Sequence, residues 1–304
     1  MHSPLVRRLV LGTFVAIAAW GCGTSTTTPP VAITKPNLAT SQSTDPPVAA
    51  APALFVTISD NQSLTVEEYI DLGMPAHERP WSSVDMANAA NVLTEIANRD
   101  PIQLPRYHGT KSGELFSRLT STENFGLFQN QSLPLKIRTL SCVQYMQAAN
   151  AVNKAYLSGL LDRKTGADET TELTGHILRG TVVIVELLVE AEKALDKNDP
   201  IYSTRLNDFR QARAGMGFTV QGVIIQVSEP KTWETQTLGR NIGYMEETFP
   251  SIMRVLPKNV QTEVSKQLKR MSDNPEFSEH KTSLESMLDK ISKAEEIPAN
   301  QGAR

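Results

Sequence analysis

Residues 134–161, PLKIRTLSCVQYMQAANAVNKAYLSGLL, contain the pattern that decides the fold. Apolar side chains recur in this stretch every three or four residues, a spacing that places them along one face of an α-helix. Pro134 suits the start of such a helix, and Gly166 suits the break after it. We therefore predict one long amphipathic helix here. Its apolar face would consist of Ile137, Leu140, Val143, Met146, Ala149, Val152, Tyr156 and Leu160.

Helix signals continue on both sides of this stretch. Upstream, the capping box Thr65-Val-Glu-Glu68 opens a short helix, and Ser82 or Ser83 opens another that runs to about Asn98. Downstream, helices are expected from about Glu169 to Asp196 and from Asp199 to about Val227, with a last one over about 276–293. Shorter helices fill the interval before the last one. The residues that punctuate them are Pro230, Gly239, Pro250, Pro257 and Pro275.

These signals predict an all-α domain over residues 54–297, followed by a disordered tail at 298–304. The architecture is a multi-helix bundle or a stack of helical hairpins, with about seven to nine helices. The stretches 182–189 and 218–227 are apolar nearly all round, which is typical of central helices. The alternative is a pair of helices that insert into a membrane, although each stretch is shorter than the roughly 20 residues of a spanning helix.

Residues 1–21 have the order of an export signal. Arg7 and Arg8 precede an apolar run from Leu9 to Ala19, which is too short for a membrane-spanning helix, and small residues follow. The segment Ala19-Trp-Gly-Cys22 resembles the lipobox of bacterial lipoproteins. The resemblance implies cleavage before Cys22, a diacylglycerol on its thiol and attachment to a membrane of the bacterial cell envelope. The alternative is an ordinary secretory signal followed by an unrelated cysteine.

The segment after the cysteine, residues 23–53, has the composition of a tether. It holds six prolines, ten Ser or Thr residues, no aromatic residue and two charges. Such a segment buries too little apolar surface to offset its ordering entropy, so we predict a disordered, partly polyproline-like chain that spans roughly 30 Å as a coil. Gly23 stands where aspartate would retain a lipoprotein in the inner membrane. The resemblance therefore implies the outer membrane if the source is Gram-negative, and no cofactor is expected beyond the lipid on Cys22.

Charge and cysteine content narrow the choice of partners and chemistry. The chain has a net charge of −3, and loss of residues 1–21 leaves 28 basic and 33 acidic residues, a net charge of −5. Without a strongly basic block, nucleic acid is not expected as a partner. Lipid on Cys22 leaves Cys142 unpaired, so no disulfide within the chain is predicted. We interpret Cys142 as a small buried hydrophobe rather than a redox or catalytic thiol.

Three short catalytic motifs occur in an order that their chemistry does not allow. Ser228-Glu-Pro-Lys231, Ser272-Asp-Asn274 and Lys164-Thr-Gly166 match motifs of serine β-lactamases and penicillin-binding proteins. In those enzymes the K-T-G motif comes last and lies on a strand, whereas here it comes first, between two predicted helices. Pro230 within S-x-x-K also opposes the helix that would place the lysine one turn from the serine. We therefore reject an acyl-enzyme mechanism.

Metal-binding patterns are weak as well, because neither H-E-x-x-H nor a paired E-x-x-H is present. Glu172 and His176 stand four residues apart, with Glu169 nearly one turn earlier, and a surface hydrogen-bonded pair is the simplest interpretation. Glu186 lies in an apolar stretch, where burial could shift its pKa. An ion pair is the alternative for Glu186. Its candidate partners include Arg179, Arg210 and Arg213.

Residues 101–133 differ from the rest because their pattern is irregular, with at most one short helix near Glu114 to Leu119. Long irregular segments in compact domains are often functional. The candidate ligand-binding residues of this insertion are Arg106, Tyr107, His108, Glu123 and Asn124. The alternative is a structural cap on the bundle. Its packed side chains would be Leu115, Phe116, Phe125, Leu127 and Phe128.

We therefore expect an envelope-anchored lipoprotein whose helical domain is a protein-interaction or structural module. Its partners would be the membrane, through the lipid, and another envelope protein or a second copy of the chain. A non-enzymatic role is favoured over catalysis. The alternative is a small-molecule or glycan-binding protein, or a hydrolase, that uses the 101–133 insertion.

Replacing the lipid-bearing residue tests the anchor. We expect Cys22→Ser to release the protein from the membrane fraction and to abolish incorporation of a labelled fatty acid, because serine offers no thiol for the acyl donor. Fractionation and metabolic labelling measure both effects. A variant that stays membrane-bound, together with a wild-type chain that never incorporates label, would exclude lipidation.

Overall fold

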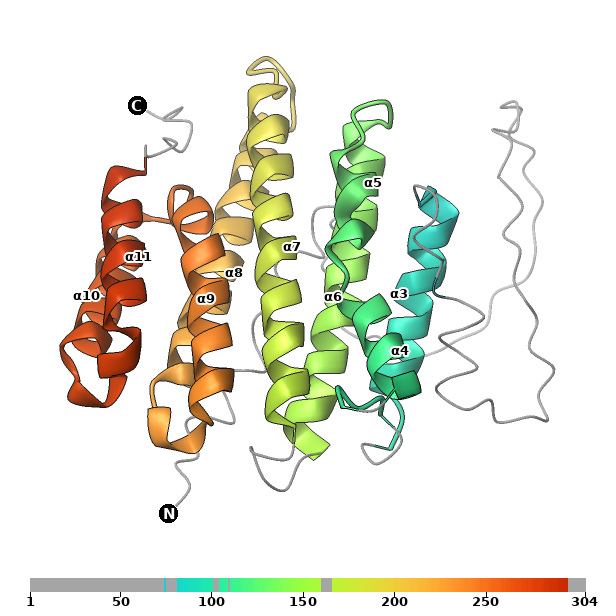
Figure 1. Cartoon of the computed structure of the whole chain (residues 1–304). Coiled ribbons are helices and arrows are strands. Elements are labelled where there is room, and N and C mark those ends of the chain that lie inside the picture. Colours follow the sequence, from blue (N-terminus) through green and yellow to red (C-terminus); the bar gives the residue numbers. More distant parts are fainter. Residues whose placement is uncertain (1–73, 75–80, 101–103, 109, 160–165, 295–304) are drawn as a thin grey trace, which may run out of the picture.

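The computed structural model describes residues 74, 81–100, 104–108, 110–159 and 166–294 (Figure 1). Every regular element among them is helical, which confirms the predicted all-α fold. In this part of the chain, eight α-helices have 11 to 27 residues, and their number falls within the predicted seven to nine. The predicted helix after Thr65, the export signal, the tether and the tail lie outside the described residues.

The long helices begin and end close to the predicted positions. The Ser82 side chain caps α3, accepting from the Asp85 N–H while the Asp85 carboxylate accepts from the Ser82 N–H. The α-helices are α3 (Ser83–Ala97), α4 (Thr110–Thr120), α5 (Gly126–Gln129), α6 (Leu135–Gly159), α7 (Ala167–Lys193), α8 (Tyr202–Val227), α9 (Thr235–Met253), α10 (Lys258–Asp273) and α11 (Lys281–Lys293). The 3-10 segments are η3 (Thr122–Phe125), η4 (Pro230–Thr232) and η5 (Pro275–His280).

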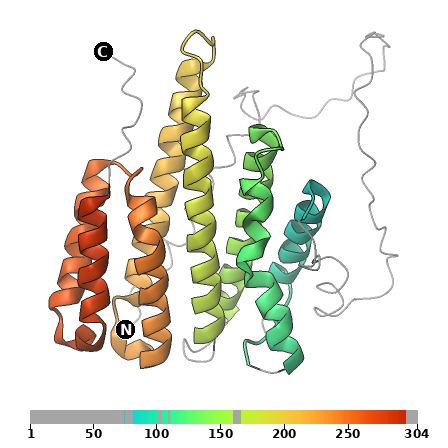
Figure 2. The same cartoon turned by 45° about the horizontal axis from the view of Figure 1, so that its top comes forward.

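The helices are arranged as a row with a partial second layer. In the row, α3 packs on α6, α6 on α7, α7 on α9 and α9 on α11. The second layer holds α8, which lies behind α7 and α9, and α10, which packs on α8 and α11 (Figures 1 and 2). The shorter α4 and α5 pack on α7, and α5 also packs on α6. The helix α7 therefore contacts elements on both sides of it and in the layer behind.

The two apolar stretches contribute to the core, as predicted for central helices. In α7, Val185 and Leu188 are fully buried, and in α8 Val220 and Val227 are fully buried. Three residues of these stretches nevertheless lie outside the core. Glu186 is exposed, because it lies on the outer side of α7 rather than among apolar neighbours. Phe218 and Ile225 are also exposed, because α8 packs on the row through its other face.

The 101–133 insertion is more regular than predicted, because α4, η3 and α5 occupy most of it. Gly113 does not break α4. It allows the preceding segment to cross the helix, since a Cβ at this position would lie 2.7 Å from the Tyr107 carbonyl oxygen. The Ser121 hydroxyl caps η3 by accepting from the Glu123 N–H. The apolar side chains of the insertion pack into the core, as the structural-cap alternative predicted. They are Leu115, Phe116, Phe125, Leu127 and Phe128.

Two residues expected to separate short helices lie inside α9 instead. Gly239 occupies the second turn of α9, where a Cβ would lie 3.3 Å from the His280 ring. Pro250 lies in the last turn, so it removes one hydrogen-bond donor close to the helix end and α9 continues to Met253. The resulting 19-residue helix is long enough to pack against both α7 and α11.

A close approach between α7 and α9 gives a stability prediction. A Cβ on Gly175 would lie 2.6 Å from ring carbons of Tyr244, so alanine must displace that ring. We expect Gly175→Ala to destabilise the fold by about 1–3 kcal/mol, although alanine favours helix by up to about 1 kcal/mol. Urea unfolding measures the difference. The control is Gly243→Ala on α9, where a Cβ meets nothing within 4 Å and stabilisation is expected. Equal stabilisation of both variants would contradict the packing argument.

Candidate functional site

The segment before α4 lies across the N-terminal end of α7. The carboxylate of Glu169 accepts a hydrogen bond from the Tyr107 backbone N–H at 2.9 Å and forms an ion pair with Arg106 at 3.0 Å. On α6, the Tyr156 hydroxyl donates to the Pro105 carbonyl at 2.5 Å. Because Glu169 is buried and Arg106 is partly exposed, the pair fixes this segment at the edge of the core.

Two carboxylates of α7 hold Arg240 of α9. The Arg240 guanidinium forms ion pairs with Asp168 and, at 2.8 Å, with Glu172. One turn later on α9, the Tyr244 hydroxyl donates to the other Glu172 oxygen at 2.6 Å. Burial and the hydrogen bond to Glu172 raise the pKa of Tyr244, so this hydroxyl keeps its proton at neutral pH.

Two predicted residues of the insertion complete this cluster. The Nε2 atom of His108 lies 2.5 Å from Asp168, and the Arg240 guanidinium lies 5.2 Å from the centroid of the Tyr107 ring. The cluster thereby joins the segment before α4 to α7 and α9. We name it the α7–α9 cluster. Its members are Arg106, Tyr107, His108, Asp168, Glu169, Glu172, Arg240 and Tyr244.

A second polar cluster lies inside the core, around His176. Its Nδ1 atom lies 3.1 Å from the Thr120 carbonyl oxygen, which can only accept, so Nδ1 carries the proton. The Nε2 atom then accepts from the Tyr145 hydroxyl at 2.9 Å, and the Asn124 amide donates to the Tyr145 oxygen at 2.8 Å. The predicted surface pair of Glu172 with His176 is therefore wrong, because His176 is buried among core residues.

Burial controls the protonation of this second cluster. Desolvation lowers the pKa of His176 to about 4, and the hydrogen bond to the Thr120 carbonyl only partly opposes the shift. The ring is therefore neutral at pH 7. The same loss of water raises the pKa of Tyr145 and of the Cys142 thiol. Cys142 is fully buried, in keeping with its interpretation as a small hydrophobe.

The structure divides the five predicted ligand-binding residues among three places. Arg106, Tyr107 and His108 belong to the α7–α9 cluster, and Asn124 belongs to the buried His176 cluster. Glu123 is exposed at the start of η3. The structure therefore gathers three of the five and separates the other two from them.

Sequence reasoning missed Arg240 and Tyr244, which supply the α9 side of the cluster. A signal was present, because polar residues recur along α9 at helical spacing from Thr237 through Asn241. The Asn241 amide donates to the Thr171 hydroxyl at 2.7 Å, so this polar stripe faces α7. The sequence alone does not show which helix this polar stripe faces, so the stripe resembles an ordinary exposed face.

A groove of about 640 Å³ lies away from both clusters, where the end of α9 meets α10 and α11. Five basic residues and no carboxylate belong to its lining, and Met253 and Ile291 supply apolar surface. The full lining is Met253, Arg254, Lys258, Gln261, Thr262, Ser265, Lys266, Lys269, Arg270, Ile291, Ser292 and Ala294. We name it the α9–α11 groove.

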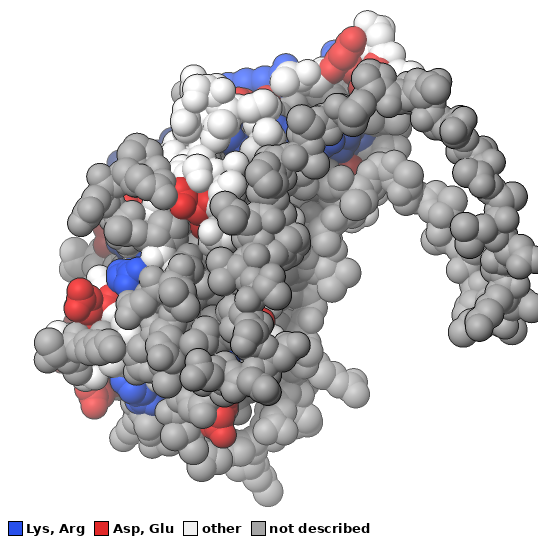
Figure 3. Space-filling view, turned by 90° about the vertical axis from the view of Figure 1, so that its right-hand side faces the viewer, with Lys and Arg blue, Asp and Glu red and all other residues white. Residues whose placement is uncertain are grey.

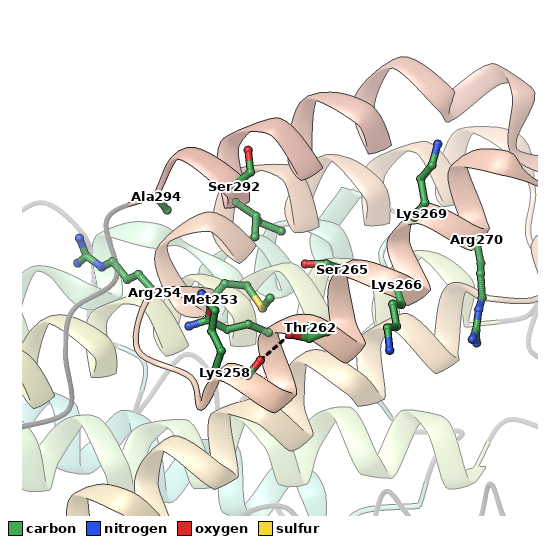
Figure 4. Close-up of a pocket in the computed structure, with 12 residues that line it drawn as sticks. Met253, Arg254, Lys258, Thr262, Ser265, Lys266, Lys269, Arg270, Ser292 and Ala294 are labelled. Carbon is green, nitrogen blue, oxygen red and sulfur yellow. Dashed lines mark hydrogen bonds between the residues drawn. The ribbon is translucent and has the colours of Figure 1, made fainter. Parts of the chain in front are cut away.

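The cations are distributed along the groove rather than aimed at one point (Figure 4). Arg254 lies at one end, and Lys266, Lys269 and Arg270 lie toward the other. In this view the end of the Lys269 side chain points toward α11, whereas the ends of Lys266 and Arg270 point away from α11. The arrangement contrasts with the α3 end of the domain, where the described acidic and basic side chains are interspersed (Figure 3).

Within the described residues, no group of three or more His, Cys, Asp or Glu side chains could hold a metal ion. No described helix is both long and apolar enough to cross a membrane. Comparison with protein-family models, curated proteins and solved structures gives no match for this chain.

The buried imidazole predicts a loss of stability in acid. The pKa of His176 is about 4 in the folded chain, against an ordinary value of 6.5, so the unfolded state takes up the proton first. The stability that the neutral ring contributes is complete above pH 6.5 and is lost as the pH falls toward 4, by about 3 kcal/mol in total. Urea unfolding between pH 7 and 4 measures it. His176→Gln should show a shallower dependence over this interval. Equal slopes for variant and wild type would refute the assignment.

Proposed function

We propose that the protein is a lipid-anchored envelope protein whose helical domain is an interaction module. We further propose that the α9–α11 groove binds an acidic segment of a partner protein. The observation that carries the proposal is the lining of this groove, which includes five cations and no carboxylate. One of these cations, Lys269, pairs with Asp273 at 2.8 Å, and the lining as a whole keeps an excess of positive charge. Such a surface attracts a partner of the opposite sign and excludes partners of the same sign.

The exposure and pairing of two cations favour the α9–α11 groove over the α7–α9 cluster as the binding site. Lys266 and Arg270 are exposed, and among the described residues neither forms an ion pair. In contrast, Arg240 is held by two carboxylates of α7. A cation without an internal ion-pair partner breaks no interaction within the protein when it turns toward an incoming carboxylate. For the same reason, the alternative use of the insertion as a small-molecule, glycan or hydrolase site has less support.

The shape of the groove favours an extended segment over a single anion. From Lys258 to Arg270, α10 spans roughly 18 Å at 1.5 Å per residue. An extended chain of about six residues covers this length at 3.3 Å per residue. Because the ends of the Lys269 and Lys266 side chains point in different directions, one small anion would not reach both (Figure 4). The apolar side chains of Met253 and Ile291 would contact apolar side chains between the acidic ones.

Reversing the two cations without ion-pair partners tests the proposal. We expect the double variant Lys266→Glu/Arg270→Glu to bind a fluorescein-labelled hexaglutamate peptide about tenfold more weakly, because four units of charge change at exposed sites. Fluorescence anisotropy at low salt measures the affinity, and added salt should weaken wild-type binding.

The matched control is Lys136→Glu/Lys154→Glu, which makes the same change of charge at two exposed positions of α6. This variant should bind the peptide nearly as well as the wild type. An equal loss in both variants would show that net charge alone drives binding. That result would remove the groove from the proposal.

A further inference from the structure

One face of α8 exposes large apolar side chains to solvent. Phe218 is 52% exposed and Ile225 is 39% exposed, and they are seven positions apart, which is about two helical turns. Ala214 and Gly222 lie on the same side of the helix, each four residues from Phe218. We name this surface the α8 outer face, with members Ala214, Phe218, Gly222 and Ile225.

The α8 outer face has no cover among the described elements. The helix packs on α7, α9 and α10 through its other side, and it lies behind α7 and α9 in both views (Figures 1 and 2). A Cβ built on Gly222 would meet nothing within 4 Å, so a shallow open notch lies one turn from Phe218. The remaining exposed large apolar residues do not share a helix face in this way. They are Val84, Ile137, Leu157 and Ile201.

The large and small members of this face alternate in a self-complementary order. In an antiparallel pair of α8 helices related by a two-fold axis near residue 220, positions equally distant from the axis face each other. Phe218 of one copy then faces Gly222 of the other. Ala214 likewise faces Ile225. Each large side chain thus meets a small one, as an isologous interface requires.

Two charged residues also lie at nearly equal distances on either side of this two-fold axis. Arg210 is exposed on α8 ten residues before the axis, and Glu229 is exposed just beyond the end of α8, nine residues after the axis. The antiparallel pairing therefore places opposite charges near each other at both ends of the contact. A parallel pairing would instead place Arg210 near its own copy.

We propose that a second copy of this chain docks on the α8 outer face, forming an antiparallel α8–α8 contact about a two-fold axis. The inference goes beyond the proposed function and does not depend on the groove. Stable interfaces bury about 1,200–2,000 Å² in total, and one helix face offers less, so the pair is weak in solution. Lipid anchors that hold both copies on one membrane would raise their effective concentration, and a larger fraction of the chains would then be paired.

The test is the mass of the full chain, purified in a mild detergent and measured by light scattering over a range of concentrations. We expect the wild type to become dimeric as the concentration rises, and Phe218→Asp to weaken dimerisation more than about tenfold. Gly222→Leu fills the notch that faces Phe218 of the other copy and should also weaken dimerisation. Circular dichroism checks that both variants fold. The matched control is Val84→Asp, at a residue that is 54% exposed on α3, and it should dimerise as the wild type does.

A charge exchange tests the register. Arg210→Glu places two carboxylates together at each end of the contact and should weaken the dimer, whereas the double variant Arg210→Glu/Glu229→Arg should restore it. A wild type that stays monomeric at millimolar concentration would overturn the proposal. Dimerisation that Phe218→Asp does not change, or that Val84→Asp weakens equally, would overturn it too. Failure of the double variant to rescue would overturn the antiparallel register.

Discussion

The burial of α7 is the constraint on which the rest of the structure depends. Most residues of this 27-residue helix are buried, and several of them are polar. A buried polar side chain without a partner costs roughly 1–3 kcal/mol, and several of those on α7 meet a group from a neighbouring element. Glu169 meets the segment before α4, Thr171 meets α9 and His176 meets α6. Near the other end, Glu192 pairs with Arg213 of α8 at 2.7 Å. These contacts fix how far each neighbour can slide along α7.

The sequence alone was sufficient for the fold class and for most long helices, because their apolar spacing and caps are local properties. Ser82 and its capping box illustrate this, since both partners lie within four residues. The insertion was harder to predict, because α4 depends on Gly113 being packed under a distant segment rather than on its helix propensity. The continuation of α9 through Pro250 likewise depends on position within the helix and on packing against α11.

The candidate sites could be predicted only in part, and for a similar reason. Arg106, Tyr107 and His108 were found because unusual residues gathered in one irregular segment. Their partners Arg240 and Tyr244 come from more than 130 residues later in the chain, and only the fold brings them to α7. The cations of α10 stood out little in the sequence, because acidic residues are interspersed with them. Their grouping depends on which face of α10 meets α9 and α11.

The row of helices also has a mechanical consequence. The described chain enters the row at α3, which packs chiefly on α6, while the α9–α11 groove lies at the opposite end (Figure 1). Tension applied between the N-terminal chain and a ligand in the groove would load the helix contacts in series. The outermost helix would detach first, because it has one principal neighbour, whereas α7 has several. The protein would then lengthen in steps under force, and the groove would remain folded while α3 peels away.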